Sequence, residues 1–519
     1  MVRVSKKYVF WTLGVTTSLV LLLFAGAAYA LRAGVLKPRL VTALADALNC
    51  DVSLDKLNVQ LVPVIQVTGD GLSVRLRGRP ELPPYIEVTQ FTVNFGLLSI
   101  YRRHVDTVRL DGLRFNVPPS VGDDSPAPAA APGHALPLPR RRIFTVDHVV
   151  AHEATINFVG KTTNNRPLNL TVYDLDVKEA GIERAMRFTA SVANPIPEGL
   201  VKTAGTFGPW NRVNPPKTPM QGTYDLAEGD LSSINGIFGR VQSSGVFTGE
   251  LAGIHVEGTS HTPDFSLDLG GAPVQLDTKF AVTVDGTNGT TRLDRVEAML
   301  ITTPLVVTGA FTNLPGDGNH DVSMAVDVAD GRIEDLLRLA INTQQPVLIG
   351  DVSLKATVQL PPGTGSARQR LRAAGTFGLG HTRFTDKDIE SKLKELSARG
   401  QGRNQDEIVS RVATSVSGDF SLLRGVLTMS RVEFAVPGAA ISLAGKYTMG
   451  TEALDFTGTA RLAVSLSRAV GGFKSIFIKP FNSFFRKNGD GAVIPIAITG
   501  TRDQPQFSVR LKQVFKKEK

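Results

Sequence analysis

Residues 416–464 read VSGDFSLLRGVLTMSRVEFAVPGAAISLAGKYTMGTEALDFTGTARLAV, a run in which apolar and polar residues alternate between glycine-containing breaks. Alternation with a period of two gives a strand one apolar and one polar face. We expect Gly418, Gly425, Gly438 and Gly450 to mark turns between successive strands. The stretch therefore predicts an antiparallel β-meander.

The same period of two extends over most of the chain. Short fragments also recur: AGTFG at 204–208 returns at 374–378, and a looser Gly-x-aromatic form occurs at 309–312 and 445–448. These fragments indicate a repeated β-hairpin unit. The expected fold class is mainly β, an antiparallel sheet with a few short helices. Alternating segments elsewhere in the chain lie at 86–95, 113–117, 155–160, 265–269, 278–286, 305–311 and 322–328.

Three stretches change to helical spacing. Between residues 35 and 49, Leu40, Val41, Leu44 and Leu48 recur on one face, and Pro38 fits a first helical turn. A second short helix is expected over 333–341, and a helical hairpin over 386–412.

The N-terminal stretch Tyr8 to Leu31 contains no charged residue. As a helix it would rise about 36 Å at ~1.5 Å per residue, enough to cross a hydrocarbon core of ~30 Å. Basic residues flank both ends, so their distribution alone sets no orientation, but a short basic N-terminus before a first apolar segment usually stays in the cytosol. A cleaved signal peptide is the alternative, since Ala28-Tyr29-Ala30 fits the small-x-small cleavage pattern. Either interpretation predicts that the rest of the chain is exported.

Residues 468–487, RAVGGFKSIFIKPFNSFFRK, combine bulky apolar and basic side chains. Such a helix can lie in a membrane interface, or it can cap the end of a sheet. We keep both alternatives for this segment. Its candidate contact residues are Phe473, Phe477, Phe481, Phe484 and Phe485.

The composition shifts along the chain predict a division into segments. Residues 118–142 contain seven prolines and predict an exposed loop or linker. The predicted segments are a cytoplasmic N-terminus 1–7, a transmembrane anchor 8–31, a helix with strands 32–117, the loop 118–142, a central β-rich region 143–365, a helical insertion 366–415 and a C-terminal meander 416–519.

Motifs that carry catalysis are missing from the sequence. There is no Gly-x-Ser-x-Gly nucleophile elbow, no phosphate-binding loop and no dinucleotide fingerprint. His148 and His152 lie next to Glu153, but the pattern there is that of a strand, where an offset of four does not converge on a metal. The net charge of +9 is partly concentrated at the two ends of the chain and forms no basic, aromatic-rich stripe, which argues against nucleic acid as a partner. We expect a non-enzyme without cofactor or metal.

Several strand-patterned segments follow the N-terminal anchor: DVSLDKLNVQLVPVIQVTGDGLSVR at 51–75, TVRLDGLRFNVPP at 107–119, residues 427–462 and the closing VIPIAITGTRDQPQFSVRL. Together they resemble the AsmA-like family of bacterial envelope proteins. The resemblance implies an inner-membrane anchor with one crossing, a periplasmic β-rich body folded into an elongated, curved groove, and a role in outer-membrane lipid homeostasis. It also implies membrane phospholipids as ligands, with envelope proteins or further copies of the chain as partners.

The strand pattern supplies candidate residues for such a groove: Phe91, Val93, Phe95, Phe280, Val282 and Val284. The leading functional hypothesis is a lipid-binding or lipid-transfer groove. An assembly factor for outer-membrane proteins with a closed core is the alternative, and an exported hydrolase is a third. Alternation is the same in an open groove and in a packed sandwich, so the sequence leaves that choice open.

Overall fold

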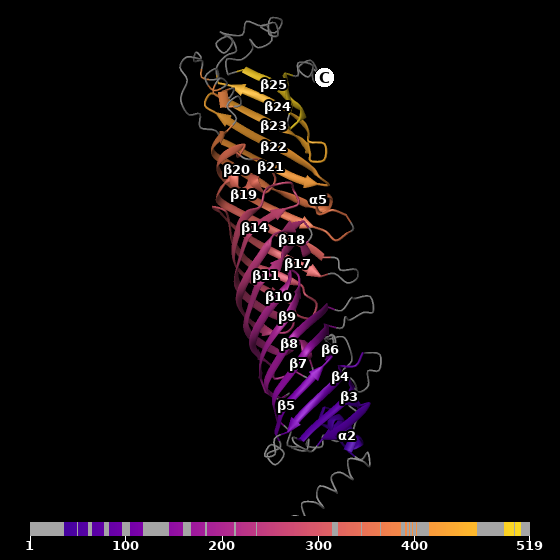
Figure 1. Cartoon of the computed structure of the whole chain (residues 1–519). Coiled ribbons are helices and arrows are strands. Elements are labelled where there is room, and N and C mark those ends of the chain that lie inside the picture. The colour runs from indigo at the N-terminus through magenta and orange to yellow at the C-terminus, as the bar shows by residue number, and fades with distance from the viewer. Residues whose placement is uncertain are drawn as a thin grey trace, which may run out of the picture. The chain divides into compact units, whose positions relative to one another are not determined.

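A computed structural model of the chain (Figure 1) describes residues 36–48, 50–60, 65–76, 83–95, 104–117, 145–158, 168–181, 184–211, 214–234, 236–313, 320–343, 345–363, 365–385, 390–391, 394, 397, 401, 415–463, 492–502 and 504–509. The chain divides into two compact units. Unit 1 comprises Met1–Ala193, Val201–Gly222 and Gly249–Ala252, and unit 2 comprises Asn194–Leu200, Thr223–Thr248 and Gly253–Lys519. Both are mainly β, as the period of two predicts.

Unit 1 begins with one helix, which strands then follow. These elements are α2 (Leu36–Leu48), β1 (Cys50–Ser53), β2 (Lys56–Gln60), β3 (Ile65–Leu76), β4 (Ile86–Phe95), β5 (His104–Asp111), β6 (Arg114–Val117), β7 (Thr145–Phe158) and β8 (Leu168–Ala180). Four further strands have residues in both units: β9 (Met186–Pro195), β10 (Glu198–Phe207), β11 (Pro219–Asp230) and β13 (Arg240–Glu250). A 3-10 turn, η1 (Pro215–Lys217), precedes β11.

Unit 2 holds the longer series of strands. In chain order its elements are η2 (Leu231–Ser233), β12 (Ile237–Phe238), β14 (Gly253–Leu267), β15 (Val274–Val284), β16 (Thr291–Leu300), β17 (Thr303–Asn313), β18 (His320–Arg332), α4 (Ile333–Arg338), β19 (Leu348–Leu360), α5 (Ala367–Arg370), β20 (Arg372–Phe384), β21 (Ser415–Leu423), β22 (Val426–Val436), β23 (Ala439–Thr448), β24 (Ala453–Leu462), β25 (Ala492–Thr501) and β26 (Pro505–Val509).

From β14 to β26 every strand pairs antiparallel with the next strand in the chain. The antiparallel meander predicted for 416–464 is confirmed over β21 to β24. Gly425 and Gly438 adopt positive φ in the tight turns of this meander, and Gly450 also lies in a turn. Gly418, however, lies inside β21, so its prediction as a turn residue is wrong.

Unit 1 departs from a purely antiparallel sheet. Strands β5 and β6 pair antiparallel with β4, but both pair parallel with β7. A parallel pair requires the chain to return along the length of the strand. Strand β7 has 14 residues and so spans about 46 Å at ~3.3 Å per residue. The 27 residues of 118–144 can cover at most ~90 Å, so this proline-rich stretch is long enough to make the return.

Helix α2 confirms the helical pattern predicted after the N-terminal stretch. Its Leu40 and Val41 pack against a core cluster of Leu54, Val88 and Phe91. The cluster closes the apolar face of the first strands of unit 1. The side chain of Lys37 donates to the Asp55 carbonyl oxygen at 2.8 Å, which ties the first turn of the helix to the sheet.

The remaining predicted helices are only partly described. Helix α4 forms as predicted but ends at Arg338. The helical insertion predicted for 366–415 is wrong in its first part, because Arg372–Phe384 forms β20. Alternation of Ala373, Gly375 and Phe377 along one face explains the strand. Most of 386–412 lies outside the described residues, as do 1–35 and 464–491. Within the described part of the chain, no helix is long and apolar enough to cross a membrane.

Candidate functional site

One face of the unit 2 sheet is apolar across its whole series of strands. In an antiparallel pair, residues directly opposite each other point to the same face of the sheet. Following these partners from strand to strand traces a row that contains only glycine and apolar residues. This row, called the central row below, is Gly258, Phe280, Val296, Val307, Val326, Ala356, Gly375, Phe420, Met429, Gly445, Phe456 and Ile498.

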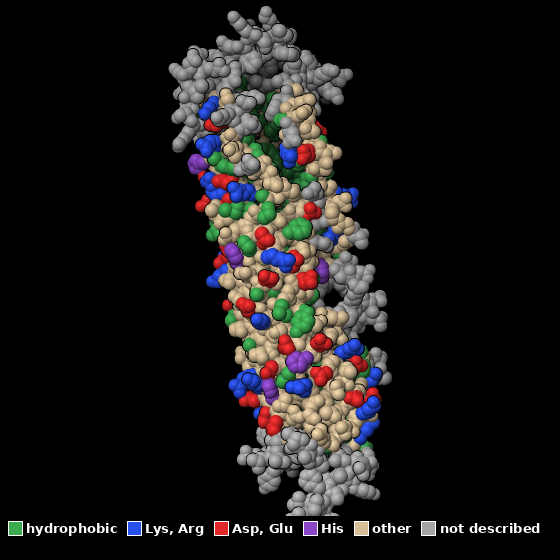
Figure 2. Space-filling view, in the orientation of Figure 1, with side chains coloured by type: hydrophobic (Ala, Val, Ile, Leu, Met, Phe, Trp, Pro, Cys, Tyr) green, Lys and Arg blue, Asp and Glu red, His purple; other side chains and the backbone are tan. Residues whose placement is uncertain are grey.

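Rows on either side of the central row continue the apolar face. One passes through Val282, Leu293 and Met324, and the other through Phe377, Gly418 and Leu443. The face therefore carries no charge in the middle of the strands. Figure 2 shows a hollow at the end of unit 2 that carries β21 to β25, with hydrophobic side chains in its depth.

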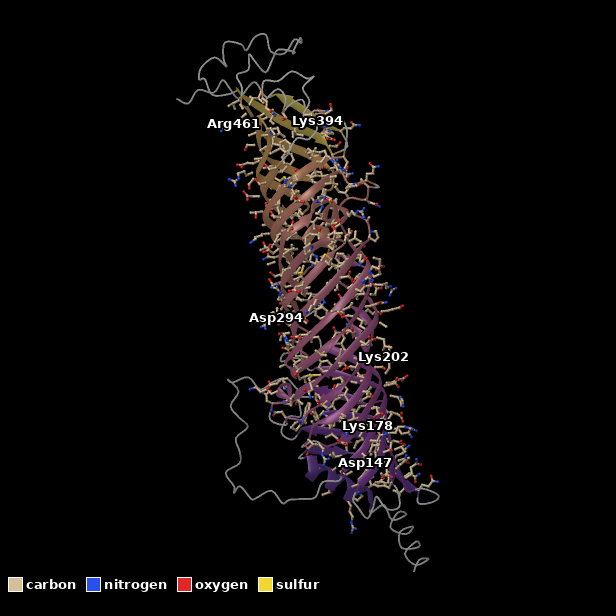
Figure 3. The ribbon with its side chains drawn as sticks, turned by 90° about the vertical axis from the view of Figure 1, so that its left-hand side faces the viewer. Asp147, Lys178, Lys202, Asp294, Lys394 and Arg461 are labelled. Atoms are coloured by element: carbon tan, nitrogen blue, oxygen red, sulfur yellow. The ribbon has the colours of Figure 1, made fainter. Side chains whose placement is uncertain are left out.

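The opposite face of the same sheet is polar. Its cross-strand row runs through Lys279, Glu297, Val306, Asp327, Lys355, Thr376, Asp419 and Arg431. Opposite charges meet in this row, with Lys355 Nζ 3.6 Å from Asp327 Oδ2 and Arg431 Nε 3.7 Å from Asp419 Oδ2. Each such exposed pair contributes only ~0.2–1 kcal/mol to stability, so the main effect of these charges is to make this face hydrophilic. Figure 3 shows Asp294 and Arg461 projecting outward from the sheet.

Burial separates the apolar face of unit 2 from an ordinary core. All twelve residues of the central row are half-buried, and none is buried. In a two-layer sandwich the centre of the inner face is packed at crystal-like density and loses contact with water. Neighbouring strands shield the central row only in part. The row therefore remains accessible on the side that faces away from the backbone.

Buried residues of this face lie within strands, as Val282 does in β15 and Gly418 in β21, and also at the strand ends beside α4. Val328, Val352 and Leu379 form a cluster against which Ile333 and Leu336 of α4 pack. At the opposite strand ends His320 stacks on Phe311, with ring centroids 4.6 Å apart. Burial lowers the pKa of His320 below its usual value, which keeps this ring uncharged at neutral pH. These side chains at both sets of strand ends, like those between them, are therefore apolar or uncharged.

The predicted groove residues fall into two different environments. Phe280, Val282 and Val284 alternate along β15 on the apolar face of unit 2. Phe91 is instead buried in unit 1, in the cluster against which Val93 and the α2 residues pack. Phe95 pairs with Ile65 at the end of β4. The predicted residues Phe473, Phe477, Phe481, Phe484 and Phe485 lie outside the described residues.

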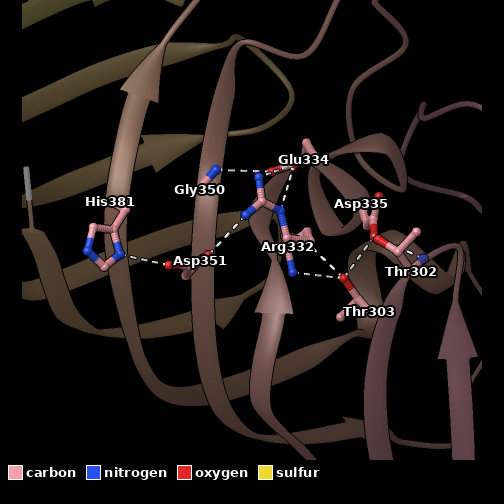
Figure 4. A network of polar contacts seen from close by, with 8 residues as sticks. All are labelled: Thr302, Thr303, Arg332, Glu334, Asp335, Gly350, Asp351 and His381. Carbon is pink, nitrogen blue, oxygen red and sulfur yellow. Dashed lines mark hydrogen bonds and ion pairs between the residues drawn. The ribbon is translucent and has the colours of Figure 1, made fainter. Parts of the chain in front are cut away.

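A polar network fixes the start of α4 in unit 2 (Figure 4). Arg332 donates to Glu334 Oε1 at 2.9 Å and to Asp351 Oδ1 at 3.0 Å, while the Gly350 amide donates to Glu334 Oε2 at 3.1 Å. The hydrogen bond to Glu334 is the main cause that raises the pKa of Arg332. His381 Nδ1 lies 2.8 Å from Asp351 Oδ2. The network joins β18, α4, β19 and β20.

Histidines on the polar faces pair with carboxylates of neighbouring strands. His148 Nε2 lies 2.6 Å from Asp176 Oδ1, and His152 Nδ1 lies 2.9 Å from Asp174 Oδ1. Each histidine thus has its own carboxylate partner on β8. No group of three or more metal-ligating side chains occurs among the residues that the structure describes.

Acid is expected to destabilise unit 2 through two of these pairs. The hydrogen bond from His381 is the main cause that lowers the pKa of Asp351, and the hydrogen bond from His261 does the same for Asp277. A carboxylate whose pKa is lowered by folding stabilises the protein above its unfolded pKa of about 3.9, and that stability is lost as the pH falls through the folded pKa. We therefore expect the urea concentration at the midpoint of unfolding to decrease as the pH is lowered below about 4.

The matched test is a variant that lacks both histidine partners. His261→Ala with His381→Ala should flatten the fall of the urea midpoint below about pH 4. An unchanged slope would assign the acid sensitivity to other carboxylates.

No family model, no curated protein and no solved structure matches this chain.

Proposed function

We propose that this chain is a membrane-anchored lipid-binding and lipid-transfer protein whose apolar sheet face holds acyl chains. The observation that carries the proposal is the central row: an unbroken apolar row that is half-buried from β14 to β25. We further propose that the sheet curls lengthwise into an elongated groove, as the resemblance to the AsmA-like family implies. No residue needs to perform chemistry in this function, which agrees with the expectation of a non-enzyme.

The energetic reason for such a face is the cost of exposing lipid tails. A two-chain lipid carries about thirty methylenes, and exposing each to water costs ~0.8 kcal/mol, or about 24 kcal/mol in all. A sheet face that is apolar on every strand can contact the acyl chains in place of water along its whole length. Thirteen strands at ~4.8 Å spacing give about 60 Å of face in the hydrogen-bonding direction. That is several times the ~15 Å that one acyl chain occupies in a bilayer leaflet.

Glycines and strand irregularities support a curled sheet. The register shifts between β15 and β16, between β16 and β17, and between β21 and β22. Such bulges bend strands and increase twist, and interior glycines allow close approach of neighbouring backbones. A Cβ added at Gly375 would lie 2.8 Å from Ala356 Cα, so the two strands are too close there for a side chain.

The proposed location is a bacterial inner membrane, with residues 8–31 as a single crossing and the bulk of the chain in the periplasm. The uncharged length of 8–31 and its basic flanks support this placement. The segment 468–487, with its phenylalanines and lysines, is proposed to contact a membrane interface or to cap the sheet. Membrane phospholipids are the proposed ligands, with envelope proteins or further copies of the chain as partners.

Photocrosslinking tests the proposal by comparing the two faces of one strand. A photoreactive amino acid at Phe280 or Val284 should crosslink to phospholipid in cells, because both side chains lie half-buried on the apolar face. The matched controls are Lys279 and Thr283 on the polar face of the same strand. We expect lipid adducts at least about tenfold more abundant at the apolar positions, as a free-energy difference of ~1.4 kcal/mol would give.

Two results would reject lipid binding. Equal labelling of the two faces would show that contact with lipid is unspecific. Crosslinks to proteins alone at Phe280 and Val284 would favour the alternative function, an assembly factor for outer-membrane proteins.

A further inference from the structure

Phenylalanine rings in unit 2 lean over glycines of the neighbouring strand. A Cβ added at Gly418 would lie 3.0 Å from Phe377 Cζ, and one added at Gly445 would lie 2.7 Å from Phe456 Cδ1. In both cases the phenylalanine and the glycine are direct cross-strand partners. A third pair, Gly258 with Phe280, has the same arrangement, with 3.0 Å from the added Cβ to Phe280 Cζ.

These pairs make local flat areas in the apolar face. The glycine contributes no side chain, and the ring occupies the space above it with its own surface. Glycine inside a strand costs ~0.5–1 kcal/mol relative to alanine, so three such pairs need a compensating gain. Contact between ring and glycine backbone supplies part of it, as in the stabilisation of strand glycines by cross-strand aromatic residues. All three rings are nevertheless half-buried, so part of their surface is left for another molecule.

We propose that the phenylalanine–glycine pairs select lipids with unbranched acyl chains over lipids with methyl-branched chains. This inference rests on the proposed lipid-binding function. An unbranched chain can keep its methylenes at the ~3.5–4.0 Å contact distance from a flat floor along its length. A methyl branch holds the neighbouring methylenes away, and a gap of ~0.5–1 Å forfeits a quarter to a half of each contact. A flat apolar surface therefore binds unbranched chains more tightly, because dispersion contacts are lost at every methyl branch.

The test uses the full chain purified in detergent and two phosphatidylethanolamines that differ only in their chains. One carries palmitoyl and oleoyl chains, and the other carries two phytanoyl chains with regular methyl branches. The two lipids compete at equal concentration, and native mass spectrometry counts the bound species. We expect the unbranched lipid to be bound about tenfold more, equivalent to ~1.4 kcal/mol.

Variants connect the preference to the pairs. Phe456→Val and Phe377→Val each replace one flat ring by a branched side chain. Because two of the three pairs remain in each variant, each should reduce the preference from about tenfold to about fivefold. Phe311→Val is the matched control, because Phe311 lies on the same face but opposite Val322 instead of a glycine. It should leave the preference near its original value. Circular dichroism and the thermal midpoint identify any variant that fails to fold; because the two Phe→Val changes lie in different strand pairs, either folded variant suffices.

The outcomes separate this inference from the function on which it rests. Binding of both lipids without preference, or an undiminished preference in folded Phe456→Val and Phe377→Val, would overturn the selection and leave lipid binding intact. A higher affinity for the phytanoyl lipid would also overturn it. Absence of any bound lipid would overturn the proposed function itself.

Discussion

A Leu443→Asp variant is expected to retain at most about a tenth of the phospholipid that copurifies with the unaltered chain, the equivalent of at least ~1.4 kcal/mol. Leu443 lies in the middle of β23, opposite Val432 on one side and Gly458 on the other. A carboxylate at this point would have to lose its water whenever an acyl chain covered it, which costs several kcal/mol. The expected defect is therefore in lipid binding, measured as lipid per protein by mass spectrometry.

The neighbouring residue provides the matched control. Ala444 is exposed on the polar face of the same strand, where it is opposite Thr457. Ala444→Asp introduces the same charge one residue away and should leave the bound lipid unchanged. Equal loss of lipid in both variants would mean that the charge acts at a distance and not through the apolar face.

The stability of Leu443→Asp distinguishes an open face from a closed one. Leu443 is half-buried, so an aspartate there can keep water when no lipid is bound, and we expect a loss of about 1 kcal/mol or less. In a closed core the same charge would be buried without a partner and would cost ~3–5 kcal/mol. A loss of that size in urea denaturation would support the assembly-factor alternative instead.

The period of two in the sequence was sufficient to predict the strands and the apolar side of each. Phe280, Val282 and Val284 were assigned to one face from alternation alone, and β15 places them there. Local pattern succeeds here because side-chain direction in a strand follows directly from backbone geometry. The helices α2 and α4 were predictable for the equivalent reason, a repeat of apolar residues on one helical face.

What covers an apolar face could not be predicted from the sequence. Phe91 and Phe280 have the same alternating surroundings, yet Phe91 is buried in the cluster that α2 covers and Phe280 is half-buried in unit 2. Coverage depends on elements distant in the chain, whereas the alternation records only that one side avoids water. The parallel pairing of β5 and β6 with β7 was missed for the same reason, since it depends on where the chain returns after residue 144.

Gly418 illustrates a local signal with two meanings. A glycine between apolar residues predicts a turn from its conformational freedom, but it can equally mark a close approach inside a strand. The ring of Phe377, in a strand that is separated from β21 by about thirty residues of chain, decides between them. The recurring Gly-x-aromatic fragments carried part of this information. Strands β20 and β21 pair one of them, at 374–378, reciprocally with a Gly-x-Phe segment at 418–420: Gly375 is opposite Phe420, and Phe377 is opposite Gly418.

Asp335→Ala is expected to destabilise unit 2 by about 2–4 kcal/mol, the largest stability effect of any single substitution in the network of Figure 4. The carboxylate is buried and its Oδ2 accepts three hydrogen bonds, from the Thr302 amide at 3.1 Å, the Thr302 hydroxyl at 2.6 Å and the Thr303 hydroxyl at 2.9 Å. Removing it abolishes three hydrogen bonds to a charged acceptor, each worth ~1.5–3 kcal/mol. The loss is partly offset, because Thr302 is exposed to water and the Thr303 hydroxyl also lies 3.3 Å from the Arg332 carbonyl oxygen.

The same substitution also removes a negative charge from the first turn of α4, where it interacts favourably with the helix dipole. Asp330→Ala is the control, because Asp330 is an exposed carboxylate of the preceding strand, and its loss should change stability by about 0.5 kcal/mol or less. Urea denaturation measures both variants, and hydrogen exchange of the α4 amides should show the helix opening in Asp335→Ala first. Because α4 covers Val328, Val352 and Leu379 at one margin of the apolar face, its release would enlarge the exposed apolar surface. A folded Asp335→Ala variant with unchanged α4 exchange would mean that packing of Ile333 and Leu336 alone holds the helix in place.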